Sequence, residues 1–268
     1  MARASLKNVM RLIDSAKSQL PPEQDFLNDL KRSIEITENN SQHKPSKTFK
    51  PSSMNCIRNM YFQVVGEEQD ENMTSYVLAG IVHSGSDIHE RIQQAVIDMK
   101  LNGMDCEYVN VAEYVKSRNL DYLDIVKEPN FKQHDFETKL YHKVLNMSFL
   151  CDGIIKYKNK YYILELKTET SYKWQNRKEV DPKHFNQGTA YSLAFGINDV
   201  IFVYISRDTL DMKSFMFSVT DDMRENLVSK IMECENYVKV FKVPPMPEEA
   251  SPKFCAYCSY KGACKNEQ

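Results

Sequence analysis

Four cysteines divided between the two ends of the chain constrain its fold more than any other feature. Cys56 lies near the start, whereas Cys255, Cys258 and Cys264 lie close to the end. The C-x2-C-x5-C tail supplies three thiolates, and a thiolate-bound zinc ion or iron–sulfur cluster usually takes four ligands. Cys56 is the natural candidate for the missing one. We therefore expect residues 248–268 to close onto Cys56, so that a metal centre clamps the domain between them.

The other cysteines, Cys106, Cys151 and Cys234, have no second cysteine close by in the sequence. We expect each of them to be an ordinary buried thiol. The odd total of 7 cysteines includes a C-x-x-C pair, and in a reducing compartment this pattern favours metal ligation over disulfides.

Composition excludes several classes of protein. The chain has 268 residues, of which 42% are hydrophobic and 27% charged, and this suits one large globular domain with or without an appended helical piece. A net charge of −2 lacks the basic excess of a non-specific DNA-coating protein, so any site for a polyanion must be a local patch. The sequence contains neither a membrane-length apolar run nor a signal-peptide pattern. We expect a cytoplasmic protein with no membrane partner.

The first part of the chain predicts helices. Apolar residues recur at helical spacing over 4–20, a second helix is expected from Glu23, and the polar stretch 38–46 reads as a linker. We therefore assign residues 1–47 to a helical extension with its linker and residues 48–268 to the main domain.

The main domain predicts a mixed α/β fold. Pro51 and the serines after it are expected to start a short helix that carries Cys56, and Ser84 or Ser86 is expected to cap a longer helix. Alternating apolar residues then predict strands, with a tight turn at 158–160 that makes an antiparallel hairpin. The expected strands are 139–143, 149–158, 160–168, 199–206 and 214–219, and the expected helices are 181–196 and a last one capped by Asp221 and running through Val240.

The hairpin carries the sharpest chemical pattern of the sequence. Asp152 lies on its first strand, and Glu165 and Lys167 lie two residues apart on its second strand, so that they share one face. Carboxylates bind Mg²⁺ or Mn²⁺, and an ammonium can position water or offset charge on a phosphate. Alternating Glu and Lys is also common on surface strands, but Glu165 lies in the apolar run YYILEL, where a buried carboxylate needs a partner or a metal.

The spacing D-x12-E-x-K resembles the core of the PD-(D/E)XK nucleases. Flanking motifs resemble the RecB-like branch of that superfamily, namely G-x-x-x-H from Gly85 to His89 and Q-x-x-x-Y from Gln187 to Tyr191. The iron–sulfur subset of this branch, which includes the CRISPR-associated exonucleases and AddB-type helicase–nucleases, places one cysteine before and three after the nuclease core. The resemblance covers about residues 48–268. It implies a restriction-endonuclease-like fold, in which helices flank a mixed central sheet.

The resemblance implies roles for particular residues. His89, Asp152, Glu165 and the backbone carbonyl of Leu166 would hold the catalytic Mg²⁺ or Mn²⁺, and Lys167 would be the catalytic lysine. Gln187 and Tyr191 would flank the site, although a polar helix edge would give the same pattern. The sequence departs from the family at Cys151, where a proline or small residue is common. An additional upstream acid is common in such sites, and Glu137 is the candidate, with Asp135 close by.

Spacing alone does not decide which metal the four cysteines hold. Zinc ribbons usually pair two C-x-x-C knuckles, whereas this chain has one such pair, a more distant Cys264 and the remote Cys56. The family resemblance favours a 4Fe–4S cluster over Zn²⁺. With either group, we expect a structural clamp that lies apart from the catalytic metal.

A local basic patch is the candidate DNA-binding surface. Lys173, Trp174, Arg177 and Lys178 follow the hairpin, and Tyr172 adds a second aromatic ring that could stack on unpaired bases. A solvated charged loop would look the same in the sequence.

These features together predict a metal-dependent DNA exonuclease that acts on single strands or DNA ends. Such an enzyme would serve recombination, repair or replication, with a helicase or recombination protein as partner, and its compact form would suit a phage genome. Two other hypotheses stay open. One is a non-catalytic DNA-binding or scaffold subunit with a nuclease-like fold, and the other is a zinc-binding adaptor.

Overall fold

The structure is a computed structural model, and it describes residues 21–40, 46–70, 75–133, 135–248, 250, 255, 256 and 258–266. The helix expected over 4–20 lies outside these residues. The chain divides into two compact units. One comprises residues 1–43 and 73–83, and the other comprises residues 44–72 and 84–268. No helix in the described part of the chain has an apolar stretch long enough to cross a membrane.

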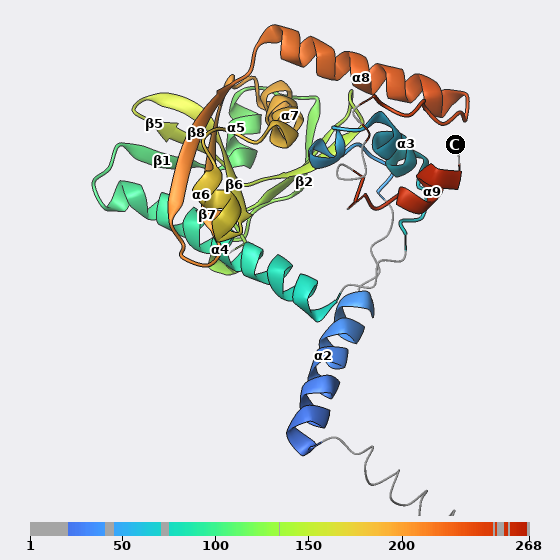
Figure 1. The fold of residues 1–268 in the computed structure, drawn as a ribbon. Coiled ribbons are helices and arrows are strands. Elements are labelled where there is room, and N and C mark those ends of the chain that lie inside the picture. Colours follow the sequence, from blue (N-terminus) through green and yellow to red (C-terminus); the bar gives the residue numbers. More distant parts are fainter. Residues whose placement is uncertain are drawn as a thin grey trace, which may run out of the picture. The chain divides into compact units, whose positions relative to one another are not determined.

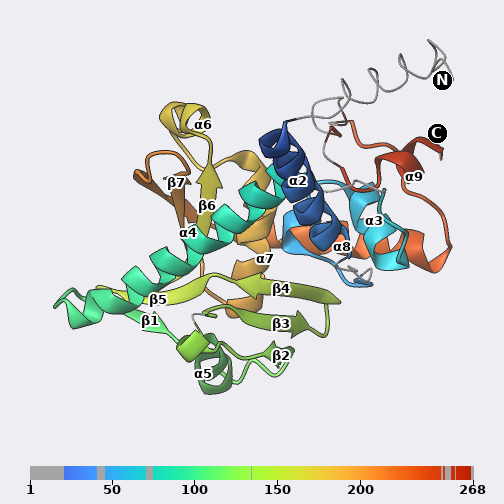
Figure 2. The same cartoon turned by 90° about the horizontal axis from the view of Figure 1, so that it is seen from below.

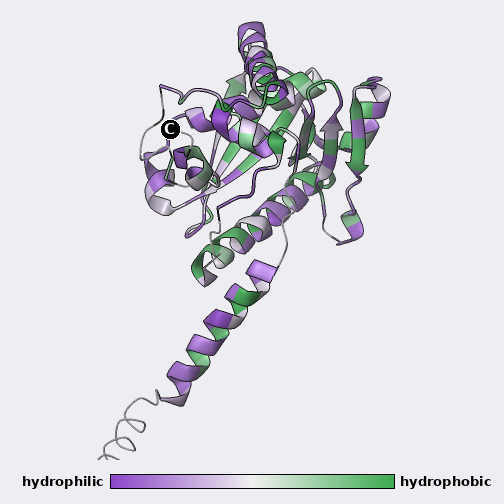
Figure 3. Cartoon of the chain, turned by 90° about the vertical axis from the view of Figure 1, so that its right-hand side faces the viewer, coloured by the Kyte–Doolittle hydropathy of each residue, from purple (hydrophilic) through white to green (hydrophobic). Residues whose placement is uncertain are grey.

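The smaller unit contains helix α2 (Pro22–Asn40) and the beginning of helix α4 (Tyr76–Leu101). Helix α2 was predicted from Glu23 onward, and its hydrophobic residues lie exposed among hydrophilic ones (Figure 3). The prediction that Ser84 or Ser86 caps α4 is wrong, because the apolar run from Tyr76 extends the helix toward the N-terminus. The Oγ of Ser75 instead accepts a hydrogen bond from the backbone N–H of Leu78 at 3.2 Å.

The larger unit contains a central five-stranded sheet in the order β1-β5-β6-β7-β8 and a three-stranded sheet in the order β2-β3-β4. Strands β6 and β7 are parallel, and all other neighbours are antiparallel. This mixed sheet with flanking helices confirms the predicted fold class (Figures 1 and 2). The strands are β1 (Cys106–Val109), β2 (Leu123–Lys127), β3 (Thr138–His142), β4 (Met147–Cys151), β5 (Gly153–Tyr157), β6 (Lys160–Glu169), β7 (Asp199–Ser206) and β8 (Met212–Ser218).

The helices of this unit are joined to the strands by short segments. They are η1 (Pro51–Ser53), α3 (Ile57–Val65), the rest of α4, α5 (Val111–Ser117), η2 (Phe131–Gln133), α6 (Ser171–Asn176), η3 (Pro182–His184), α7 (Phe185–Phe195), α8 (Asp221–Lys239) and α9 (Lys261–Asn266). The helix expected over 181–196 is present as the 3-10 helix η3 followed by α7. Two local expectations were wrong. Cys56 precedes α3 instead of lying inside the first short helix, and Thr220 caps α8 in place of Asp221. The reason at α8 is that the Thr220 side chain accepts from the N–H of Met223.

The predicted hairpin is formed by β5 and β6. Tyr157 pairs with Lys160, so only Lys158 and Asn159 make the turn. Both residues have positive φ angles, 47° and 63°, which is the conformation that a two-residue turn between twisted strands requires.

The single strand expected over 149–158 is instead two strands that belong to different sheets. Asp152 lies between β4 and β5, at the corner where the chain leaves the three-stranded sheet. Gly153 permits this corner, because a Cβ there would lie 2.7 Å from Cε2 of Tyr108. The Tyr108 ring occupies that space, and its single hydroxyl proton is shared between the carbonyls of Asp152 and Phe136, at 3.0 and 3.2 Å.

The two faces of the central sheet pack against different helices. Leu164 and Leu166 of β6 pack toward α4 in a cluster with Ile88. Glu165, which alternates with them along β6, faces α7, where Gln187 contacts it. Helices α4 and α7 therefore cover opposite faces of the sheet (Figures 1 and 2).

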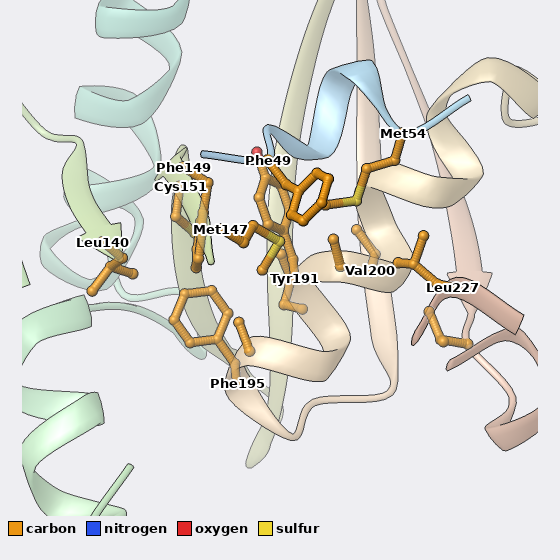
Figure 4. Close-up of a cluster of buried hydrophobic side chains, with 14 of the residues drawn as sticks. Phe49, Met54, Leu140, Met147, Phe149, Cys151, Tyr191, Phe195, Val200 and Leu227 are labelled. Atoms are coloured by element: carbon orange, nitrogen blue, oxygen red, sulfur yellow. The ribbon is translucent and has the colours of Figure 1, made fainter. Parts of the chain in front are cut away.

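Helix α7 packs between the two sheets. Figure 4 shows Tyr191 and Phe195 of this helix among the side chains of Phe149, Met147 and Phe49. The rings of Phe149 and Tyr191 lie 5.4 Å apart, and those of Phe149 and Phe195 lie 5.8 Å apart. This packing fixes the rotation of α7 about its axis and thus the direction of its polar side chains.

We predict that Gly153→Ala lowers the free energy of unfolding by about 1–3 kcal/mol, because the added methyl group displaces the Tyr108 ring. The matched control is Gly80→Ala in α4, where a Cβ meets nothing within 4 Å and alanine should stabilise the helix by about 0.5–1 kcal/mol. Denaturant titration of both variants measures the difference. Equal stability of the two variants would contradict the role given to Gly153.

Candidate functional site

The corner at Asp152 opens one edge of strand β6. Strand β5 pairs with β6 only as far as the match of Gly153 with Leu164, so the β6 backbone beyond this point faces the corner. The backbone N–H of Leu166 donates to Oδ2 of Asp152 at 2.7 Å. In a strand, the N–H and C=O of one residue point to the same side, so the Leu166 carbonyl faces the same corner. The sequence-predicted pair of Asp152 and this carbonyl is thus brought together.

Helix α4 brings His89 to the corner. Its Nδ1 lies 3.6 Å from Oδ1 of Asp152. One turn later, Gln93 is buried and donates to the backbone carbonyl of Asp152 at 2.7 Å. Gly85 lies beside β6, where a Cβ would make an ordinary van der Waals contact of 3.4 Å with Oγ1 of Thr168. The G-x-x-x-H motif therefore lies on the side of α4 that faces the sheet, with His89 at the corner.

From the opposite face of the sheet, a chain of hydrogen bonds holds Glu165. Its Oε1 accepts from the Nζ of Lys167 at 2.5 Å and from Nε2 of Gln187 at 2.7 Å. The same Gln187 amide lies 3.0 Å from the Tyr191 hydroxyl, which donates to the carbonyl of Leu150 at 2.9 Å. Gln187 and Tyr191 are both buried, so they support the site from within and do not form a free polar helix edge.

Glu137 is the upstream acid that joins this corner. Ligand atoms of His89, Glu137 and Asp152 all lie within 4.8 Å of one another. Asp135, the other acid considered from the sequence, forms an ion pair with Lys127 instead. Glu137 therefore lies with His89 and Asp152 at this corner, where it and His89 are half-buried and Asp152 is buried.

The pKa values of the acids reflect burial and crowding. Burial and the charge of Asp152 raise the pKa of Glu165 to about 8 and that of Glu137 to about 7. Burial would also raise the pKa of Asp152, but His89 and Lys167 outweigh it and lower that pKa. The pKa of His89 is raised because Asp152 outweighs the opposite effect of burial. Without a cation, the corner cannot hold all its carboxylates charged.

The donor set fits a divalent cation. Oε2 of Glu165 is buried and has no hydrogen-bond partner among the described residues. A buried carboxylate oxygen without a partner costs free energy that a coordinated ion would offset. Carboxylates, a carbonyl and one imidazole are ligands that suit Mg²⁺ or Mn²⁺.

Two supporting residues of the site, Gln93 and Tyr108, were missed from the sequence. Both donate to the backbone carbonyl of Asp152. Gln93 had a signal, since a polar residue lies one turn after His89 on the apolar face of a helix. Tyr108 had none, because strand β1 was not predicted.

The four residues expected to bind DNA differ in their surroundings. Trp174 is half-buried, and its indole N–H donates to the carbonyl of Tyr204 at 3.0 Å. Arg177 makes two hydrogen bonds to the carboxylate of Glu169, at 2.5 and 3.0 Å, and these contacts hold the loop after α6. Lys173 and Lys178 are exposed. The nearby Tyr172 is 79% exposed and is the aromatic ring available at this surface.

The C-terminal cysteines lie near α3. Asn59 of α3 donates to Sγ of Cys258 at 3.6 Å, and burial together with the neighbouring Cys56, Cys258 and Cys255 raises the pKa of Cys264. The carboxylate of Asp70 also accepts from the N–H of Gly262, at 2.8 and 3.1 Å. These contacts place the described C-terminal cysteines beside the segment of α3, with all four thiols half-buried.

Comparison with known proteins gives distant similarities alone. No family model and no curated protein matches the sequence. The crystal structure of SSO0001 is similar with 16% identity over 90% of this chain and 98% of that chain, at a TM-score of 0.45. An alkaline exonuclease (LHK-Exo) from Laribacter hongkongensis is similar with 9% identity over 74% of this chain and 90% of its own, at a TM-score of 0.37. The structure of LHK-Exo in complex with dAMP is similar with 9% identity over 74% of this chain and 92% of that chain, at a TM-score of 0.39. Similarities this distant do not indicate a function.

We predict that Mn²⁺ stabilises the protein through this corner. At a concentration a hundredfold above the dissociation constant, binding should add about 2.7 kcal/mol to the free energy of unfolding and raise the melting temperature. Asp152→Asn keeps an oxygen for the Leu166 N–H but removes the charge, so it should abolish the shift. Glu107→Gln, at an exposed residue of strand β1, is the control and should keep it. Thermal unfolding with Mn²⁺ or EDTA measures the shift, and an equal shift in Asp152→Asn would place the ion elsewhere.

Proposed function

We propose that this chain is a metal-dependent DNA nuclease, acting as an exonuclease on single strands or DNA ends. The observation that carries this proposal is the buried Glu165, whose Oε1 holds Lys167 while its Oε2 has no partner among the described residues. A structural ion pair would satisfy both oxygens. A carboxylate half satisfied by an ammonium, beside Asp152 and His89, is instead a combination that phosphodiester hydrolysis can use.

In this proposal, His89, Asp152, Glu165 and the Leu166 carbonyl hold Mg²⁺ or Mn²⁺, with Glu137 beside them. When bound, the cation supplies a more acidic water molecule and neutralises charge on the phosphate. The residues of the chain then position the reactants. The carboxylates of Glu165 and Asp152 outweigh burial and raise the pKa of Lys167, so its ammonium keeps its charge. Lys167 can therefore orient a water molecule and stabilise the negative charge that develops on the phosphate.

Gln187 keeps this arrangement fixed. Its amide nitrogen donates to Glu165, so the carboxylate cannot rotate toward solvent. Lys173 and Lys178, with Tyr172, are exposed beside α6 and offer charge and a ring to a single strand. We assign Trp174 and Arg177 to the support of this surface, since both are engaged in contacts with the sheet.

We further propose that Cys56, Cys255, Cys258 and Cys264 hold a 4Fe–4S cluster, with Zn²⁺ as the alternative. The support is the placement of three of these thiols around Cys264 at the end of the chain. The contact of Asn59 with Cys258 favours a clamp that joins the C-terminal tail to α3.

We predict that the purified wild-type protein with Mg²⁺ or Mn²⁺ degrades end-labelled linear single-stranded DNA and leaves covalently closed circles intact. Lys167→Ala should lower the rate by about a hundredfold or more, because it removes a charge that stabilises the transition state. Lys242→Ala, on an exposed segment, is the control and should act like the wild type. If wild-type and Lys167→Ala proteins both leave linear DNA intact, the catalytic claim fails, and a non-catalytic DNA-binding or scaffold subunit becomes the leading alternative.

A separate prediction concerns the cysteines. Protein purified without oxygen should contain iron and acid-labile sulfide, and Cys264→Ser should lose both together with part of its thermal stability. Cys106→Ser, at a buried residue of strand β1, is the control and should keep the iron. Stoichiometric zinc without sulfide would identify the zinc alternative, and absence of any metal would overturn the assignment.

A further inference from the structure

His184 lies on the face of α7 that is directed toward the acidic corner, which comprises His89, Glu137, Asp152 and Glu165. It immediately precedes the helix, one turn before Gln187 and two turns before Tyr191. Side chains at these spacings share one face of a helix. Gln187 contacts Glu165 from this face, so His184 lies at the open end of the same row.

Strand β7 places the His184 ring beside Lys167. In the parallel pairing of β6 and β7, Glu165 matches Phe202 and Lys167 matches Tyr204. Paired residues of neighbouring strands point to the same face, and their strands lie about 4.8 Å apart. The His184 ring stacks on both partners, at 6.0 Å from Phe202 and 5.8 Å from Tyr204. The imidazole therefore lies over β7, one strand away from the lysine.

Hydrogen bonds assign the position of the proton on this imidazole. The Tyr204 hydroxyl accepts from the backbone N–H of Asp181 at 3.0 Å, and it lies 2.9 Å from Nδ1 of His184. Tyr204 is fully buried, so its own proton needs an acceptor, and within the described part of the chain His184 Nδ1 is the one in reach. Nδ1 therefore accepts, and Nε2 carries the proton.

The charges around His184 keep the ring neutral. Burial, followed by Lys167 and Lys183, lowers the pKa of His184 to about 3, although Asp181 acts in the opposite direction. A neutral ring can lie near two ammonium groups without repulsion. It presents one donor, the Nε2–H, whereas Lys167 and the exposed Lys183 attract an anion to the same place.

We propose that His184 binds a backbone phosphate of the DNA substrate, with its Nε2–H donating to a non-bridging phosphate oxygen next to Lys167. This inference rests on the proposed nuclease function. It adds a substrate-binding residue to the site and gives the η3 segment a purpose, because Asp181 and Tyr204 together fix the direction of the imidazole. The competing explanation is that His184 only fills the space above Tyr204.

Two substitutions separate these explanations. In His184→Asn, the side-chain oxygen can take the position of Nδ1 and accept the Tyr204 proton, but no donor reaches the position of Nε2. In His184→Gln, the amide nitrogen can take the position of Nε2 and keep the donor. A space-filling role predicts that any loss of DNA binding follows a loss of melting temperature in either variant. A phosphate-binding role predicts that Asn loses affinity for DNA at an unchanged melting temperature, whereas Gln keeps it.

The test measures binding to single-stranded oligonucleotides with Ca²⁺ in place of Mg²⁺, and cleavage with Mg²⁺. We expect His184→Asn to weaken DNA binding or raise KM about tenfold, the effect of one lost hydrogen bond to a charged group, while melting temperature stays near that of the wild type. His184→Gln should recover most of this loss. Oligonucleotides with one neutral methylphosphonate linkage at successive positions locate the contact. At one position the wild type should lose affinity and His184→Asn should not.

Each outcome decides the question. If the wild type binds and cleaves DNA but His184→Asn does so equally well, or responds to every methylphosphonate as the wild type does, the phosphate contact is wrong while the nuclease proposal stands. If both substitutions lower the melting temperature and DNA binding alike, the space-filling explanation is right. If the wild type neither binds nor cleaves DNA, the nuclease proposal fails, and this inference fails with it.

Discussion

The hydrogen bonds around Asp152 are the constraint on which the rest of the larger unit depends. The chain changes sheets at this residue, and a buried corner leaves backbone groups without the partners that a continuous strand would provide. Gln93 and Tyr108 satisfy the Asp152 carbonyl, and the Asp152 carboxylate satisfies the N–H of Leu166. One residue thus receives bonds from α4, β1 and β6. These bonds hold the carboxylate in a position where it remains available to a cation.

The same corner explains why residues distant in the sequence meet. Because β5 stops pairing at Gly153, β6 has no strand neighbour on this side beyond Leu164, and the Asp152 carboxylate takes that place. His89 reaches Asp152 from α4, and Gln187 reaches the neighbouring Glu165 from α7. In a continuous sheet, these helices would be separated by a full layer of strands. The change of sheet therefore produces the site as well as the fold.

Sequence patterns could predict the parts of this arrangement that local spacing determines. Alternation and turn chemistry predicted the hairpin of β5 and β6, and spacing singled out Asp152, Glu165 and Lys167. The corner itself could not be predicted, because an apolar run such as 149–158 does not show where a strand changes partners. Tyr108 was missed for a related reason, since its hydrogen bond to the Asp152 carbonyl joins elements far apart in the sequence. Whether a basic residue of this segment is exposed, as Lys173 is, or half-buried, as Arg177 is, likewise depends on the fold and not on local spacing.

Strand β6 offers an internal comparison that argues for the choice of site. It carries two buried glutamates on one face, Glu165 and Glu169, which are 2% and 5% exposed. The guanidinium of Arg177 binds both oxygens of Glu169, so that carboxylate is fully paired inside the protein. Glu165 has two donors on one oxygen and none among the described residues on the other. A fold that can pair a buried glutamate completely four residues further on leaves Glu165 incomplete, and this difference favours an external ligand at Glu165 over an ion pair that serves stability alone.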